Sequence, residues 1–276
     1  SKWLVLSDVS PFQMTMMRFW AFAALSLLMG WRRGGIRASF RSAYPLLQML
    51  RGALLVADIW LYVLALIKVP MAAVQSITLI YPLLVTVFAI PLLGEKVGVF
   101  RIGAVVMGFV GALVIVRPGG LPLDIGVFYA AASGAAYALY IVLTRKVSAT
   151  DSTTTSMVYT GVVGLVISSG VGVFHWAALE PIALLLIVYI MITGVVAHGM
   201  MVYALSMAPA SVLQPFNYTS LPWSILLGLV VFHEALDPIS LLGAAIIAGA
   251  GLVVMARERI RKVPQASAEP ALPGKE

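Results

Sequence analysis

The sequence predicts an all-α integral membrane protein, a ten-helix bundle of two inverted five-helix repeats whose first helix is largely missing from this chain. Its composition, a duplicated sequence pattern and the charges of its loops lead to this fold class. Of the 276 residues, 61% are hydrophobic and 11% are charged, whereas a soluble domain has roughly 45–50% apolar and about 25% charged residues. This composition excludes a water-soluble fold.

Apolar stretches near the ~20 residues that a helix needs to cross a bilayer occur along the whole chain. They cover residues 12–31, 46–67, 71–93, 98–116, 125–144, 154–174, 181–205, 210–232 and 238–256. Residues 1–9 are too short to span and run into Ser10-Pro11, a turn that opens the next helix. Because the second half of the chain holds five spans and the first only four, we expect a further helix upstream, with residues 1–7 as its outer end.

One sequence pattern occurs twice, once in each half of the chain. Segment 63–75 matches segment 202–214 at its Val, Ala, Leu, Pro and Gln positions, and Glu95 falls on Glu234 when the alignment continues without a gap. Duplicated membrane units are typical of transporters. The pattern predicts a first repeat over 1–117, a second repeat over 118–257 and a disordered tail over 258–276.

Loop charges predict the orientation of the spans. The loop after span 12–31 contains Arg32, Arg33, Arg37 and Arg41 and no acid, which marks it as cytoplasmic. Alternation from this loop places most other basic residues, and the C-terminus, on the cytoplasmic side. An odd number of spans separates equivalent loops, so the second repeat is inverted relative to the first, the geometric basis of alternating access.

The same distribution of charge bears on partners and cofactors. The basic residues lie in short loops rather than on one face, so we expect the lipid bilayer and no nucleic acid as a partner despite a formal charge of +7. The chain has no cysteine, which excludes thiol nucleophiles and thiolate metal sites. We expect no cofactor and no metal.

Asp58 and His198 form a candidate titratable pair. Asp58 lies near the centre of span 46–67, and the alignment of the two repeats places it within one position of His198, in the corresponding span of the second repeat. A carboxylate at this depth is costly unless it faces the bundle interior or water. The pair could bind a substrate amine or carry a proton. Alternatively, His198 is a neutral core histidine and Asp58 pairs with Arg18 or Arg51.

Two prolines mark candidate hinges. Pro82 and Pro222, which also align to within one position, interrupt spans 71–93 and 210–232, where each frees a backbone carbonyl. Amide and aromatic side chains near these prolines and near Asp58 suit a zwitterionic or aromatic ligand; the alternatives are hydrogen bonding between helices and the usual enrichment of Trp and Tyr at membrane interfaces. The predicted cavity comprises Asp58, Trp60, Tyr62, Gln75, Thr78, Tyr81, Tyr137, Tyr140, His198, Gln214, Asn217, Tyr218 and Trp223.

Other repeated positions are predicted to belong to the scaffold. Glu95 and Glu234 stand where one helix ends and the next begins, and a carboxylate there accepts from free backbone N–H groups. Spans 98–116 and 238–256 carry few polar side chains, so we expect them to pack or to face a dimer partner. The glycines expected to allow close packing are Gly103, Gly108, Gly111, Gly243, Gly249 and Gly251.

Motifs in both halves resemble those of a known family. They are Ser10-Pro11 with Arg18-Phe19; Gly94-Glu95-Lys96 with Gly103-Ala104 and Gly108; and His233-Glu234-Ala235 with Gly243-Ala244. In this order and spacing the chain resembles the drug/metabolite transporter superfamily, in its EamA-like branch of ten-helix transporters. His233 replaces the glycine that usually precedes the glutamate. The resemblance implies a bundle that exports small metabolites.

We therefore expect a transporter of the bacterial inner membrane that exports small neutral and aromatic amino acids and related metabolites by alternating access, as a monomer or alternatively a dimer. A drug or other metabolite carrier of the same superfamily is the alternative. An intramembrane enzyme is disfavoured, because no span contains a Ser–His pair, a His-x-x-x-His spacing or a close carboxylate pair.

Overall fold

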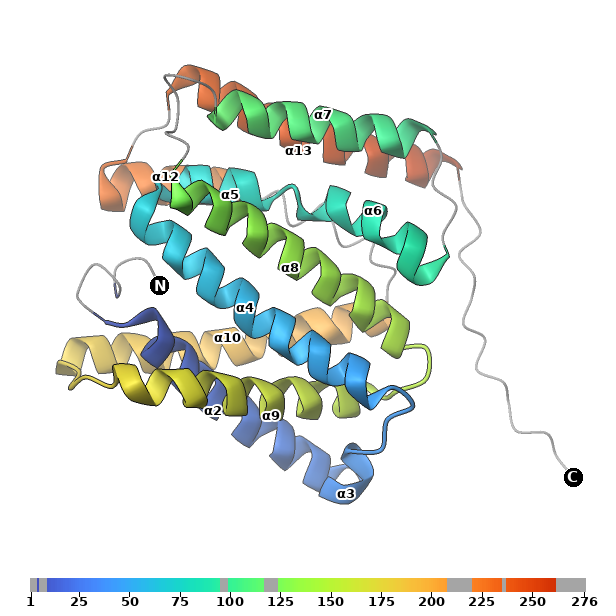
Figure 1. The fold of residues 1–276 in the computed structure, drawn as a ribbon, viewed down its shortest axis with the longest axis vertical. Helices are drawn as coiled ribbons and strands as arrows, with labels where there is room; N and C mark the ends of the chain where they lie inside the picture. Colours follow the sequence, from blue (N-terminus) through green and yellow to red (C-terminus); the bar gives the residue numbers. More distant parts are fainter. Residues whose placement is uncertain are drawn as a thin grey trace, which may run out of the picture.

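The computed structural model describes residue 4 and residues 9–94, 99–116, 124–207, 220–234 and 237–261. Within these ranges the chain forms helices and no strand, and the long helices lie side by side in Figure 1. In chain order they are α2 (Pro11–Arg32), α3 (Ile36–Ser39), α4 (Pro45–Lys68), α5 (Met71–Thr78), α6 (Tyr81–Leu93), α7 (Val99–Val116), α8 (Ile125–Val147), α9 (Thr153–Gly172), the 3₁₀ turn η1 (Val173–His175), α10 (Pro181–Met207), α12 (Ser220–Phe232) and α13 (Pro238–Arg261). The all-helical fold class is confirmed.

Six spans in the described residues are long and apolar enough to cross a membrane. Most of the predicted spans match single helices within a few residues. Span 71–93 differs, because its helix is interrupted at Leu79 and Ile80 and continues as α6. Pro82 lies in the first turn of α6, where a proline lacks no hydrogen bond that the helix would otherwise make.

The prediction that Pro82 kinks a continuous helix is therefore wrong, because Pro82 lies at the start of α6. Pro222 is the third described residue of α12, and its predicted role as a kink stays untested. Residues 210–219, the rest of that predicted span, are outside the described residues. The helix is interrupted at Leu79 and Ile80, next to Pro82. A hinge is a statement about motion, so the hinge role of Pro82 stays a prediction.

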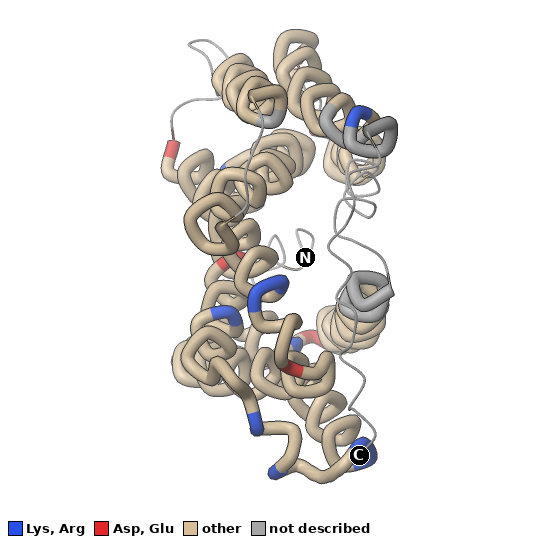
Figure 2. Tube along the Cα trace, turned by 90° about the vertical axis from the view of Figure 1, so that its right-hand side faces the viewer, with Lys and Arg blue, Asp and Glu red and all other residues tan. Residues whose placement is uncertain are grey.

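One end of the bundle collects most of the basic residues, and we call it the basic end. Here Lys146 Nζ donates to the Leu92 carbonyl at 3.1 Å, which joins the ends of α8 and α6. The Arg257 guanidinium lies 4.0 Å from the centre of the Phe100 ring, which joins the end of α13 to the start of α7. Figure 2 looks onto this end, where α2, α6, α8 and α13 finish. The other end is called the opposite end.

Helices at equivalent positions of the two predicted repeats pack against each other. Helix α2 lies along α9, and α7 lies along α13, as Figure 1 shows for the second pair. Helix α4 also packs along α8, and α5 against α12, although neither of these pairs occupies equivalent positions. The two halves of the chain are therefore interleaved rather than separate, so each half completes the packing of the other.

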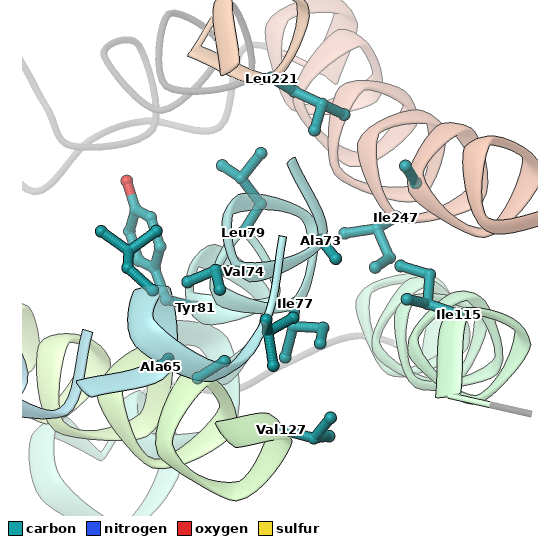
Figure 3. Close-up of a cluster of buried hydrophobic side chains, with 14 of the residues drawn as sticks. Ala65, Ala73, Val74, Ile77, Leu79, Tyr81, Ile115, Val127, Leu221 and Ile247 are labelled. Atoms are coloured by element: carbon teal, nitrogen blue, oxygen red, sulfur yellow. The ribbon is translucent and has the colours of Figure 1, made fainter. Parts of the chain in front are cut away.

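A large buried apolar cluster lies where helices from both halves meet. Figure 3 shows Ile77 of α5 and Leu79, just after it, in one cluster with Ile115 of α7, Leu221 of α12 and Ile247 of α13. Burying apolar side chains of this size between helices contributes packing energy even in a membrane, where dispersion replaces the hydrophobic effect between helices. The cluster fixes the α7–α13 pair onto the rest of the bundle.

Glycines allow a close approach of α7 and α13. A Cβ on Gly111 would lie 2.8 Å from the Gly243 carbonyl oxygen, and a Cβ on Gly243 would lie 2.6 Å from that of Gly111. A Cβ on Gly108 would collide with Leu83. The scaffold prediction is confirmed at these three glycines and wrong at Gly103 and Gly249, where an added Cβ would meet no described atom within 4 Å.

Glu234 caps a helix of the other half rather than the helix that follows it. Its Oε2 accepts from the Met71 backbone N–H at the start of α5, at 3.0 Å. The following helix, α13, is capped by Asp237, whose Oδ1 accepts from the backbone N–H groups of Ile239 and Ser240. The predicted role as a helix cap is confirmed for Glu234, while Glu95 lies outside the described residues.

A methyl group at the α7–α13 contact tests this packing. We expect Gly111→Ala to force the two backbones apart and to lower the free energy of unfolding by about 1–3 kcal/mol. Gly103→Ala is the matched control, since no atom of the described residues lies within 4 Å of its added Cβ. Thermal unfolding of the two purified variants in detergent measures the difference, and equal melting temperatures would contradict the contact.

Candidate functional site

A cavity of about 210 Å³ lies between α2, α4 and α10. These helices come from both predicted repeats. The cavity brings together two side chains of opposite charge, one imidazole and two phenylalanine rings. Its lining residues are Arg18, Phe19, Phe22, Leu55, Asp58, Ile59, Met191, Gly194, Val195 and His198.

Asp58 enters the cavity from the middle of α4. Its Oδ1 accepts a hydrogen bond from the Ser133 hydroxyl of α8, at 2.6 Å. A carboxylate has lone pairs for several donors, so this bond orients the group and leaves acceptor capacity for a ligand. Helix α8 lies close enough because α4 and α8 pack along each other and Ser133 is small and buried.

His198 faces the same cavity from α10. Its Nε2 lies 3.1 Å from the Tyr140 hydroxyl, and the edge of the Phe22 ring packs against it at a centroid distance of 5.1 Å. The structure therefore brings the predicted pair Asp58 and His198 to one cavity. It also gives His198 a partner across helices, as the alternative interpretation expected.

Arg18 supplies the positive charge of the cavity from α2. The guanidinium lies beside Gly194 of α10, where an added Cβ would be in ordinary contact with Arg18 Nη2 at 3.6 Å. Arg18 and Asp58 thus place opposite charges in one small space. The sequence places Arg18 about two turns inside its span, where an arginine either snorkels outward or draws a substrate carboxylate toward the cavity.

Arg51 has a different role from the pairing with Asp58 that the sequence left open. It is 1% exposed and donates to the Ser156 carbonyl, to Thr160 Oγ1 at 2.8 Å and to Thr144 Oγ1 at 3.2 Å. Its guanidinium also lies 5.4 Å from the centre of the Tyr140 ring. Arg51 therefore fixes α4 against α8 and α9 and supports the tyrosine that contacts His198.

A row of tyrosines connects the cavity to the break between α5 and α6. Tyr140 stacks on Tyr137 at 5.9 Å, and Tyr137 meets the Tyr81 ring edge to face at 4.8 Å. Tyr137 and Tyr140 lie about one turn apart on α8, which puts both on its inner face. Trp60 packs against Phe12 at 5.2 Å, on another side of α4, and its buried Nε1 has no hydrogen-bond partner in the described part of the chain.

Gln75 joins three helices. Its Oε1 accepts from the Tyr62 hydroxyl at 2.9 Å, and its Nε2 donates to Ser220 Oγ at 2.8 Å. These bonds tie α5 to α4 and α12, the interhelical role that the sequence offered as the alternative. Neighbouring Thr78 is buried, and its Oγ1 has no partner among the described residues. None of these side chains is among the described residues that line the Asp58 cavity.

The remaining predicted residues do not reach this cavity in the described structure. Trp223 is 64% exposed in α12 and is not among the described residues that line this cavity. Gln214, Asn217 and Tyr218 lie outside the described residues. In the part of the chain that is described, no three His, Asp or Glu side chains are placed to hold a metal ion.

Several lining residues escaped sequence analysis. In the sequence, Phe19 and Phe22 do not differ from other apolar residues of a span. They face the cavity because α2 packs against α10, which only the structure shows. Ser133 gave a weak signal, a small polar residue within the run Ala132-Ser133-Gly134. Such runs more often indicate close helix packing.

The long apolar helices define a multi-pass membrane protein with a charged cavity between them. The sequence profile of the EamA-like transporter family matches residues 1–117 and 124–256. The chain therefore belongs to the EamA-like transporter family.

Curated relatives carry two different substrate names. An S-adenosylmethionine uptake transporter of Rickettsia conorii is 25% identical over 223 residues, 80% of this chain and 75% of that protein. A riboflavin transporter of Vibrio cholerae is 31% identical over 234 residues, 83% of this chain and 77% of that protein. A riboflavin transporter of Rhizobium johnstonii is 27% identical over 268 residues, 95% of this chain and 87% of that protein.

A solved crystal structure shares the fold. It aligns with a TM-score of 0.64 at 22% sequence identity and covers 95% of each chain. At this level of identity the similarity concerns the arrangement of helices alone.

Removal of the Arg51 side chain tests the support of the cavity. We expect Arg51→Met to lower the free energy of unfolding by about 2–3 kcal/mol, because several buried acceptors lose a charged donor. Arg37→Met, at an exposed position of α3, should change it by no more than about 0.5 kcal/mol. Thermal unfolding in detergent compares them, and equal effects would contradict a structural role for Arg51.

Proposed function

We propose that this chain is an alternating-access carrier of small zwitterionic metabolites and that the cavity between α2, α4 and α10 is its substrate site. The observation that carries the proposal is the presence of Arg18 and Asp58 in one cavity. A substrate carboxylate pairs with Arg18, and a substrate ammonium or sulfonium pairs with Asp58. The carboxylate and ammonium contacts would be charged hydrogen bonds, which are among the strongest in proteins, whereas a sulfonium has no donor hydrogen and would be held by ionic attraction alone.

The rest of the lining suits the same class of substrate. Phe19 and Phe22 offer ring faces and edges to an organic cation or an aromatic group. A volume of about 210 Å³ is below the ~300–1,000 Å³ of a typical drug-sized site. It favours an amino acid, or the amino-acid end of a larger molecule, over a bulky drug.

The relatives' names support a metabolite carrier better than an exporter restricted to neutral and aromatic amino acids. S-adenosylmethionine, named for the Rickettsia relative, combines a carboxylate with ammonium and sulfonium groups. Riboflavin, named for the Vibrio relative, is uncharged at neutral pH and makes no use of paired opposite charges. Amino acids have the two charges that Arg18 and Asp58 would recognise, so they remain candidates.

Orientation and location complete the proposal. By the positive-inside rule the basic end faces the cytoplasm of a bacterial inner membrane, and the C-terminal residues of α13 lie at that end. The direction of net transport follows the gradients of substrate and coupling ions, since alternating access operates both ways.

Transport by purified protein in liposomes tests the substrate class. We expect uptake of labelled S-adenosylmethionine or phenylalanine and no uptake of riboflavin. Asp58→Asn and Arg18→Gln should each raise the substrate concentration for half-maximal uptake about 10- to 100-fold, because each removes one charged hydrogen bond.

Asp124→Asn is the matched control, because Asp124 caps its own helix by accepting from Ile125 N–H at the opposite end. It should transport as the unmodified chain does. Uptake of riboflavin alone, or zwitterion uptake that is indifferent to both cavity substitutions, would overturn the proposal.

A further inference from the structure

Helices α2 and α9 are equivalent in the two predicted repeats, and each makes a similar contact at its start. The start of α9 contacts the connection that follows α2, and the start of α2 contacts the connection that follows α9. At the basic end, Asp151, which precedes α9, reaches the connection between α3 and α4. Its carboxylate accepts from the Ser42 hydroxyl, from the Ala43 N–H at 2.9 Å and from Gln48 Nε2 at 2.8 Å. Burial alone raises the pKa of Asp151, but these hydrogen bonds outweigh it and hold the pKa below its usual range. The carboxylate is therefore ionised at neutral pH.

At the opposite end, Gln13 in the first turn of α2 reaches the connection between α9 and α10. Its Nε2 donates to the Ala177 carbonyl at 2.8 Å, and its Oε1 accepts from the Ala177 N–H at 3.3 Å. Gln13 is completely buried. This contact ties the start of α2 to the segment that leads into α10, so it closes on two of the three helices that line the cavity.

An aromatic pair accompanies each polar contact. The ring of Tyr159 in α9 meets Phe40 edge to face at 5.6 Å, and its hydroxyl donates to the Phe40 carbonyl at 3.0 Å. The ring of Trp20 in α2 stacks near Trp176 at 6.3 Å. Trp20 falls on Tyr159 in the same alignment that places Glu95 on Glu234, so the two aromatic residues occupy equivalent positions of the repeats.

The two sets of contacts are thus inverted copies of one arrangement. In one set, Asp151, just before α9, and Tyr159, in the first half of α9, bind the connection after α2. In the other, Gln13 at the start of α2 binds the connection after α9. Gln13 falls in this alignment on Ser152, the neighbour of Asp151. We call the contacts of Asp151 and Tyr159 the basic-end clasp, and those of Gln13 and Trp20 the opposite-end clasp.

A line of contacts leads from the basic-end clasp toward the cavity. Gln48 Nε2 donates to Ser156 Oγ at 3.1 Å as well as to Asp151. Arg51, one turn further along α4, binds the Ser156 carbonyl and lies against Tyr140, which contacts His198. Separation of α9 from α4 at the basic end would therefore disturb the support of the cavity wall.

We propose that the two clasps are the alternating closures of the carrier: the basic-end clasp holds the cavity shut toward the side of the basic loops, and the opposite-end clasp holds it shut toward the other side. This inference rests on the proposed function and names the regulation of the same site. Each clasp must open in turn, and both are closed in this structure. Their chemistry differs, because a carboxylate holds one and a neutral amide holds the other.

Site-directed labelling of the cavity tests the proposal, and the natural absence of cysteine makes it direct. Val195→Cys places one thiol in the cavity lining, and a charged, membrane-impermeant thiosulfonate is added to either side of sealed vesicles. Arg37→Cys, exposed in the basic-end loop, separately identifies the side that the basic end faces. The rate of Val195→Cys modification then reports cavity access without any need for a known substrate.

We expect Asp151→Asn to raise the labelling rate at least about fivefold from the basic-end side, because it weakens charged hydrogen bonds. Gln13→Ala should raise the rate from the other side by a similar factor. Asp124→Asn, whose carboxylate caps only its own helix, is the control and should change neither rate. Unchanged rates in both clasp variants, or an equal rise from both sides in either, would overturn the proposal.

A second measurement guards against a general loss of packing. Cross-linking of the pair Gln13→Cys and Ala177→Cys should abolish labelling from the far side alone, and reduction should restore it. The pair Ser42→Cys and Asp151→Cys should abolish labelling from the basic-end side alone. If access changes as expected but no metabolite is transported, the clasps stand and the proposed function fails. If transport occurs and neither cross-link affects access, the clasps fail and the function stands.

Discussion

The absence of water in the bilayer interior is the constraint on which the rest of this structure depends. Polar groups at that depth must find partners within the protein or line a cavity. Arg51 meets this demand with hydrogen bonds to three residues of α8 and α9. Asp58 and Arg18 face a shared cavity instead. This division distinguishes a charge that holds helices together from charges that are available to a ligand.

Helices at equivalent positions of the two predicted repeats meet in the bundle. Helix α2 packs along α9, and α7 packs along α13. Because the halves are interleaved, the cavity has walls from both, which is the geometry that the proposed alternating access requires. The Glu234 cap on α5 links the halves at a point where sequence order gives no hint of contact.

The sequence predicted best those features that depend on the composition of the chain or on the residues of a single helix. The membrane class, most span boundaries and the meeting of Asp58 and His198 in one cavity follow from hydropathy, length and the repeat. The sequence predicted less well which side chains of a helix face a cavity, because this depends on how the helix is rotated about its axis. Trp223 and Tyr137 have similar signals in the sequence, yet the side chain of Trp223 is exposed and that of Tyr137 is packed against Tyr140. The direction of the Arg18 side chain, which lies beside Gly194 and lines the cavity, could be seen only in the structure.

Direct competition between a ligand and a cavity thiol tests the central claim, that opposite charges in the α2–α4–α10 cavity recognise a zwitterion. The rate of Val195→Cys modification would be measured in the purified protein with S-adenosylmethionine, phenylalanine or riboflavin. Slower modification with a zwitterion, lost on Asp58→Asn, is the result that we predict. Protection by riboflavin alone, or by no zwitterion at saturating concentration, would contradict the account.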